Sequence, residues 1–218
     1  MTEQVSVNAI EEKAKKIVFD LKEASSKHEH AFPSQIEAVL VFSGPGTYYE
    51  PLKPGQPEWM RWMDRDRLRA GTAVVREVTA SRKAENLGLT DKGRGSKMSL
   101  DDVRMFGPLL VYNGVPIDDP EFRHENISAR RAFASEYSKL PEDRVIIIDE
   151  LKDENGQTRP LHHTGDQTES LFQELADSKS PLAEIRNVAL VSHLAHFIRI
   201  PFYLKNMKMN LFRTVAIG

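Results

Sequence analysis

The chain of 218 residues carries 30 Lys and Arg against 32 Asp and Glu, so its formal net charge is only -2. This balance gives no overall basic field that would attract nucleic acid or anionic lipid. The lack of cysteine excludes disulfides, thiolate nucleophiles and cysteine-ligated metal centres, and it fits a reducing compartment. The first residues show no basic-then-apolar leader, and no apolar run approaches the roughly 20 residues that cross a bilayer. We therefore expect a cytoplasmic protein without a membrane or nucleic-acid partner.

Hydrophobic patterning predicts one domain over residues 1–218, in which helices alternate with strands. In chain order, the first half is expected as a helix at 8–24 within an N-terminal segment 1–30, a strand at 37–43, a surface excursion at 44–63, a helix at 64–82, a second surface excursion at 83–107 and a strand at 109–113. The second half is expected as a helix at 126–140, a strand at 144–149, a polar connection at 150–165, a helix at 167–178, a strand at 188–192, a helix at 193–206 and a strand at 211–217.

The predicted strands are apolar on both faces, which is typical of parallel strands buried between helices. Their alternation with helices predicts right-handed crossovers and an α/β fold: an open, doubly wound, Rossmann-like sheet of five mainly parallel strands with helices on both faces. Ligands of such sheets bind beyond the carboxyl ends of the strands, where neighbouring crossovers leave to opposite faces. The commonest strand order would place the first and fourth strands side by side there. Ser43 and Ser192, at their ends, would then be neighbours.

Polar residues at the predicted strand ends form an ordered series. The series comprises a strand ending Ser43-Gly44, a helix opening Arg67-Leu68, a strand closing Asn113-Gly114, the segment Pro141-Glu142-Asp143-Arg144-Val145-Ile146, the acidic helix start Asp166-Gln167-Thr168-Glu169 and a final Val191-Ser192-x-x-x-His196-x-x-Arg199. It resembles the family of bacterial proteins that includes YdcF, SanA and ElyC, over roughly residues 36–206. The resemblance implies a Rossmann-like domain and, loosely, a nucleotide-like or phosphorylated ligand. It names no reaction and no cofactor, because the chemistry of that family is not settled.

The turn after the first strand, Gly44-Pro45-Gly46, is either a phosphate cradle or a plain turn from strand to loop. It lacks the third glycine of the dinucleotide fingerprint, and Pro45 removes one backbone donor. The second strand ends in Asn113, without the acidic residue that would hold a ribose diol. The pattern therefore disfavours NAD.

His196 and Arg199 lie three residues apart, so they share one helical face near the expected switch point. Arg199 suits the paired oxygens of a phosphate or carboxylate, and His196 has a reference pKa that suits proton transfer. The alternative is a partly buried structural histidine beside a solvated arginine. We expect the pair to serve a ligand.

Three further side chains have two interpretations each. Asp166 and Glu169 either form a capping box at a helix start or meet a ligand, with Glu169 as a base or a ribose contact. Arg67 is a cation at a helix start, where the macrodipole disfavours it, and this indicates a ligand or an acidic partner such as Asp64 or Asp66. The histidine pairs of the chain lack a three-ligand pattern, so no metal site is expected.

The candidate site therefore has catalytic candidates His196 and Glu169, and binding candidates Ser43, Gly44, Gly46, Arg67, Asn113, Gly114, Asp166, Ser192 and Arg199. Three functions remain open. The first is binding of a nucleotide-like or phosphorylated small molecule, S-adenosylmethionine among them. The second is a hydrolase or transferase acting on a phosphorylated or nucleotide-sugar metabolite. The third is a non-catalytic regulatory module in which residues 83–107 contact a protein partner.

Overall fold

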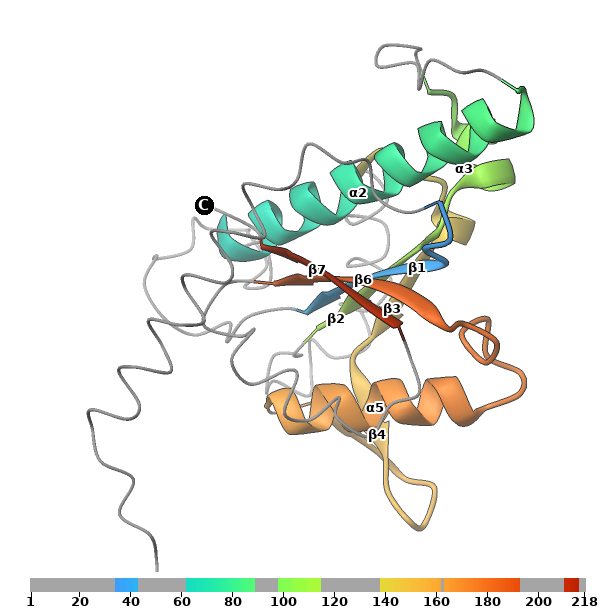
Figure 1. The fold of residues 1–218 in the computed structure, drawn as a ribbon. Coiled ribbons are helices and arrows are strands. Elements are labelled where there is room, and N and C mark those ends of the chain that lie inside the picture. Colours follow the sequence, from blue (N-terminus) through green and yellow to red (C-terminus); the bar gives the residue numbers. More distant parts are fainter. Residues whose placement is uncertain are drawn as a thin grey trace, which may run out of the picture. The chain divides into compact units, whose positions relative to one another are not determined.

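The computed structural model describes residues 34–42, 62–88, 98–114, 138–161, 163–192 and 210–215, all within one unit of residues 32–218. Its elements, shown in Figure 1, are β1 (Ala38–Phe42), α2 (Trp62–Asn86), α3 (Leu100–Phe106), β2 (Leu109–Asn113), the short 3-10 helix Glu142–Arg144, β3 (Val145–Ile148), β4 (Glu150–Lys152), β5 (Thr158–Pro160), α5 (Thr164–Ala176), β6 (Asn187–Ser192) and β7 (Asn210–Val215). The described part of the chain is thus mixed α/β.

A parallel sheet with the order β3-β2-β1-β6 forms the core, and β7 pairs in parallel with β6 on its outer side. Every residue of β1 is buried, because β1 lies in the middle of the sheet and is covered on both faces. This burial explains the uninterrupted apolar run of β1. The prediction of an α/β chain built on parallel strands is confirmed.

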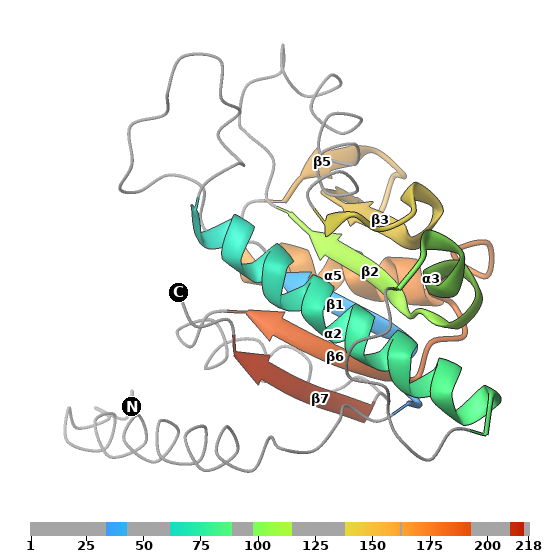
Figure 2. The same ribbon diagram turned by 90° about the horizontal axis from the view of Figure 1, so that it is seen from above.

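Helices cover both faces of this sheet (Figure 1). On one face, Leu68 and Val75 of α2 pack in one core cluster with Val41 of β1. On the other face, Leu171 of α5 belongs to a second cluster with Leu40. Figure 2 shows α2 lying over the sheet and running along the direction of its strands. No helix in the described ranges is long and apolar enough to cross a membrane.

The amino end of the sheet is closed by the guanidinium group of Arg82. It donates to the carbonyl oxygens of Ser34 at 2.6 Å, Ile36 at 2.6 Å and Phe106 at 2.9 Å. One side chain of α2 therefore joins the segment before β1 to the end of α3. The loss of water around this half-buried group lowers the pKa of Arg82, and nearby Glu37 opposes that effect.

Glu37 makes a second connection at the same end of the sheet. Its Oε2 accepts the backbone N–H groups of Arg186 at 2.7 Å and Asn187 at 2.8 Å, which ties the start of β1 to that of β6. Burial raises the pKa of Glu37, but these hydrogen bonds and the charge of Arg82 outweigh burial and leave the pKa below its usual value.

Several boundaries differ from the sequence-based predictions. The helix expected at 64–82 continues to Asn86, and the excursion expected at 83–107 contains α3. The connection expected at 150–165 contains the antiparallel hairpin of β4 and β5. The predicted helices at 8–24 and 193–206, most of that at 126–140, and nearly all of the excursion at 44–63 lie outside the described residues.

A capping box stabilises the start of the short helix α3. Ser99 Oγ accepts the N–H of Asp102, and the Asp102 carboxylate accepts the N–H of Ser99. Lys83 of α2 adds an ion pair to Asp102 at 2.8 Å. These hydrogen bonds give partners to backbone N–H groups at the start of the helix, and they stabilise a helix of seven residues within the segment expected as an excursion.

The Asp102 cap predicts a pH effect at the acid end. The hydrogen bond from Lys83, followed by those of Ser99, lowers the pKa of Asp102 from 3.8 to about 2. A carboxyl with a depressed pKa stabilises the fold above its unfolded pKa, and this contribution is lost as the pH falls through the folded pKa. We expect Asp102→Asn to melt below the parent at pH 5, and the difference to vanish as the pH falls from 3.8 to about 2. Melting curves across this pH range check the prediction. A difference in melting temperature that stays constant with pH would contradict it.

Candidate functional site

Polar side chains end three neighbouring strands at the carboxyl edge of the sheet. Asn113 of β2 is in register with Phe42 of β1. Val191 of β6 pairs with Val41, so Ser192 stands opposite Phe42. The residues two positions before Asn113 and Ser192 pack in the α5-side cluster, and side chains alternate along a strand. Asn113 and Ser192 therefore both point to the face that α5 covers.

The Asn113 side chain is held by α5 through a reciprocal pair of hydrogen bonds. Its Nδ2 donates to the carbonyl oxygen of Gln167 at 2.6 Å, and Gln167 Nε2 donates to the carbonyl oxygen of Asn113 at 3.0 Å. A flipped amide would set two acceptors against each other, so this contact also defines the orientation of the amide. Asn113 Oδ1 therefore points away from the carbonyl oxygen of Gln167.

Two buried oxygen atoms at this edge have no hydrogen-bond partner among the described residues: Asn113 Oδ1 and Ser192 Oγ. Asn113 is 1% exposed and Ser192 is 0% exposed. A buried polar group without a partner costs about 1–3 kcal/mol, so such groups are rare and need an explanation. They stand two strand spacings apart, about 10 Å between backbones.

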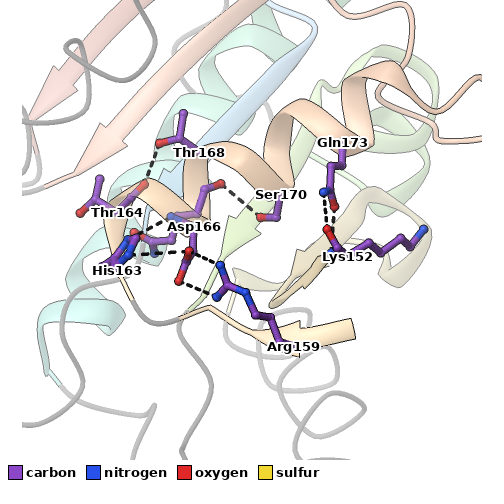
Figure 3. A network of polar contacts seen from close by, with 9 residues as sticks. Lys152, Arg159, His163, Thr164, Asp166, Thr168, Ser170 and Gln173 are labelled. Carbon is purple, nitrogen blue, oxygen red and sulfur yellow. Dashed lines mark hydrogen bonds and ion pairs between the residues drawn. The ribbon is translucent and has the colours of Figure 1, made fainter. Parts of the chain in front are cut away.

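The N-terminus of α5 lies at the same edge, as the contact between Gln167 and Asn113 establishes. His163 is the N-cap, and its Nδ1 accepts the N–H of Asp166 at 3.1 Å (Figure 3). The first helical backbone bond runs from Gln167 N–H to the His163 carbonyl. The N–H groups of Thr164 and Gly165 precede that bond. Such helix-start donors, with the helix dipole behind them, favour an anion.

A buried carboxylate lies behind this helix start. Asp166, only 3% exposed, accepts two hydrogen bonds from Arg159 of β5, at 2.7 and 3.0 Å (Figure 3). The bond to Asp166 raises the pKa of Arg159. The paired charges compensate each other, so Asp166 does not repel an anion at the helix start. The predicted capping box is not present: His163 is the cap, and Asp166 binds Arg159 instead.

Arg67 lies on the opposite face of the sheet, because it belongs to α2. It is 2% exposed, and its Nη1 donates to the carbonyl oxygen of Phe42 at 3.1 Å. Of the two aspartates suggested as partners, Asp66 pairs with Arg69 at 3.5 Å, and the side chain of Asp64 lies outside the described residues. Arg67 therefore holds the last peptide of β1, directly before Ser43 in the chain. Arg67 thus contacts the end of β1 from the α2 face of the sheet.

The structure brings together four of the predicted residues: Asn113, Gly114, Asp166 and Ser192. Gly114 continues β2 by donating its N–H to the Ile148 carbonyl. Glu169 is exposed on α5. The remaining predicted residues lie outside the described ranges: Ser43, Gly44, Gly46, His196 and Arg199.

Sequence reasoning missed three residues of this edge: Arg159, His163 and Gln167. The position of Gln167 could have indicated its role, since a polar residue near a helix start can reach the end of a neighbouring strand. Arg159 carried none, because the hairpin that delivers it was expected as an irregular connection. Within the described ranges no group of three His, Asp or Glu could hold a metal ion. No family model, curated protein or solved structure matches this chain.

Proposed function

We propose that this chain binds a small molecule carrying hydroxyl groups and a negative charge, nucleotide-like or phosphorylated, at the carboxyl ends of β2, β1 and β6. The observation that carries the proposal is the pair of buried oxygens on Asn113 and Ser192, which have no hydrogen-bond partner in the part of the chain that the structure describes. Both lie on the face of the sheet that α5 covers, at the end where α5 begins.

The donor and acceptor types select the ligand. Asn113 Oδ1 only accepts, so the matching ligand atom must donate, as a sugar hydroxyl does. The N–H groups at the start of α5 only donate, so the matching ligand group must accept and preferably be anionic. A sugar phosphate or a nucleotide combines both groups. S-adenosylmethionine also does so, through its ribose hydroxyls and its carboxylate.

We also propose the finer classification, a doubly wound Rossmann-like sheet of five strands. The order β3-β2-β1-β6-β7 and the helices on both faces support it, since this order reverses between β1 and β6. Membership of the family of YdcF, SanA and ElyC rests on the ordered strand-end residues. A cytoplasmic location rests on the lack of cysteine. The hydrolase or transferase alternative has less support, because Glu169 is exposed on α5.

A thermal-shift series tests the proposal, because a ligand that binds only the folded state raises the melting temperature. The probes are AMP, ribose 5-phosphate and S-adenosylmethionine, with adenosine lacking the phosphate and inorganic phosphate lacking the hydroxyls. We expect at least one compound with both groups to raise the melting temperature more than adenosine or phosphate at equal concentration. Equal responses to all five, or none, would count against the proposed chemistry.

Ser192→Ala gives a sharper prediction. The substitution removes one buried oxygen without a described partner, so the free protein should keep or gain stability. Ligand affinity should fall by about 2- to 13-fold, the equivalent of one hydrogen bond of 0.5–1.5 kcal/mol. Unfolding curves and titration with the best probe measure both quantities. Lost stability with unchanged affinity would show that Ser192 serves the fold instead.

A further inference from the structure

We infer that a hollow beside α2 is a second anion site, built for a ligand that bears phosphate. The hollow has a volume of about 430 Å³ and is lined by Arg69, Thr72, Ala73, Arg76, Ser138 and Lys139. It lies apart from the pair Asn113 and Ser192, because those residues point to the α5 face and α2 covers the other.

The α2 residues of this hollow form one stripe of the helix. Positions 69, 72, 73 and 76 follow the spacing i, i+3, i+4 and i+7, which places them in line along one side. The stripe spans about 10 Å of helix, so two arginines stand roughly two turns apart. Another stripe of α2, containing Leu68 and Val75, packs in the core with the sheet. The stripe that carries Arg69 and Arg76 therefore lies at the border of the face of α2 that packs on the sheet.

The second wall comes from the residues just before β3. Ser138 is 2% exposed, and its carbonyl oxygen accepts a hydrogen bond from Arg76 Nη2 at 3.2 Å. This bond uses one of the five N–H donors of Arg76 and holds the guanidinium group against the wall. Lys139 has a φ of +51°, the left-handed region that favours glycine. A lysine there, in place of the glycine that the backbone prefers, contributes a third positive charge to the rim.

The charges of the hollow favour an anion. Its described lining residues supply three positive charges and no carboxylate, in a chain with a net charge of -2. Asp66, outside the lining, pairs with Arg69 at 3.5 Å, and Arg76 and Lys139 supply the other two positive charges of the described lining. Like charges at this spacing repel, and an anion between them removes the repulsion. The volume falls in the range of small-molecule sites. A free phosphate compound and a phosphate headgroup of a lipid share this chemistry.

Calorimetric titration of the full chain with sodium pyrophosphate at low ionic strength tests the inference. Arg76→Gln removes a charge but keeps an amide donor for Ser138, and Lys139→Gly removes a charge while it suits the left-handed backbone. We expect affinity to fall about 10-fold in Arg76→Gln. We expect about a 3-fold loss in Lys139→Gly, because Lys139 is exposed. Lys139→Gly should not lower the melting temperature.

Two controls separate this site from the rest of the molecule. Lys179→Ala removes an exposed charge after α5, outside the lining, and should leave pyrophosphate affinity unchanged. Ser192→Ala reports on binding at the carboxyl edge, because Ser192 belongs to the site proposed there. A loss in Ser192→Ala, with none in Arg76→Gln, would assign pyrophosphate to the carboxyl edge and overturn the inference.

A vesicle arm distinguishes the two sources of phosphate. Sedimentation with phosphatidic acid vesicles, against phosphatidylcholine vesicles, measures headgroup binding. Binding to phosphatidic acid that Arg76→Gln weakens, without binding of pyrophosphate, supports the site with a lipid as its source. Binding of pyrophosphate alone supports a free ligand. Binding of neither overturns the inference.

Discussion

Gly71→Val is expected to destabilise the fold by about 3 kcal/mol or more, because a side chain at this position has no room. A Cβ atom on Gly71 would lie 2.6 Å from Val41 Cγ2 and 3.2 Å from Leu110 Cδ1. Both neighbours are fully buried in the sheet, so neither can move aside without disturbing the core. The helix must rise from the strands or the strands must shift.

Gly71→Ala separates packing from helix propensity. Alanine is favoured over glycine in a helix by about 1 kcal/mol, so propensity alone predicts a more stable protein. The contact at 2.6 Å predicts the opposite, a loss of about 1–3 kcal/mol. Ala73→Val, two residues along on the exposed side of α2, is the control and should cost no more than the difference in helix propensity, about 0.7 kcal/mol. Chemical denaturation measures all three variants. A Gly71→Ala protein more stable than the parent would refute the close approach of α2 to β1.

Arg82→Ala is expected to cost about 3–5 kcal/mol of stability. The substitution leaves three carbonyl oxygens, those of Ser34, Ile36 and Phe106, without their donor. The three hydrogen bonds are partly buried. A buried acceptor left without a partner costs about 1–3 kcal/mol, and the three costs overlap because water can enter the space that the side chain vacates. The long aliphatic stem is lost as well.

Two variants test whether the planar geometry of the Arg82 guanidinium group is needed for this stability. Arg82→Lys keeps the charge but cannot serve three carbonyls with the same planar group, so it should recover less than half of the loss. Arg104→Ala, on exposed α3, removes an arginine whose ion pairs with Asp101 and Asp143 are exposed, and it should cost less than about 1 kcal/mol. Urea unfolding measures these differences. An Arg82→Lys protein as stable as the parent would show that charge alone is sufficient.

Much of the fold is accessible from local sequence. The apolar runs at β1, β2, β3 and β6 predicted these strands within one residue at either end, because strands buried on both faces cannot tolerate polar residues. The helix α3 and the hairpin of β4 and β5 were not predicted. Their stability comes from the cap at Ser99 and from pairing with another short strand, and neither leaves an apolar periodicity.

The candidate site was predictable only in part. Asn113, Gly114 and Ser192 could be selected as strand-end residues, because parallel strands bring their carboxyl ends to one edge. Asp166 was selected as a helix cap or a ligand contact, and its pairing with Arg159 was not predicted. Its carboxylate serves Arg159, a residue on a hairpin that enters the site from outside the sheet.

By itself the sequence determined the alternation of elements, the parallel strands and the edge at which polar residues gather, since these follow from the burial of whole segments. Only the tertiary structure decided which polar atoms at that edge have a hydrogen-bond partner within the described residues. The Asn113 amide could have used its oxygen or its nitrogen toward α5, and only the Gln167 carbonyl, brought there by a crossover from β3, selects the nitrogen and leaves Oδ1 without a described partner. Which hydrogen bonds a polar group makes depends on neighbours distant in sequence, and local patterns do not record those neighbours.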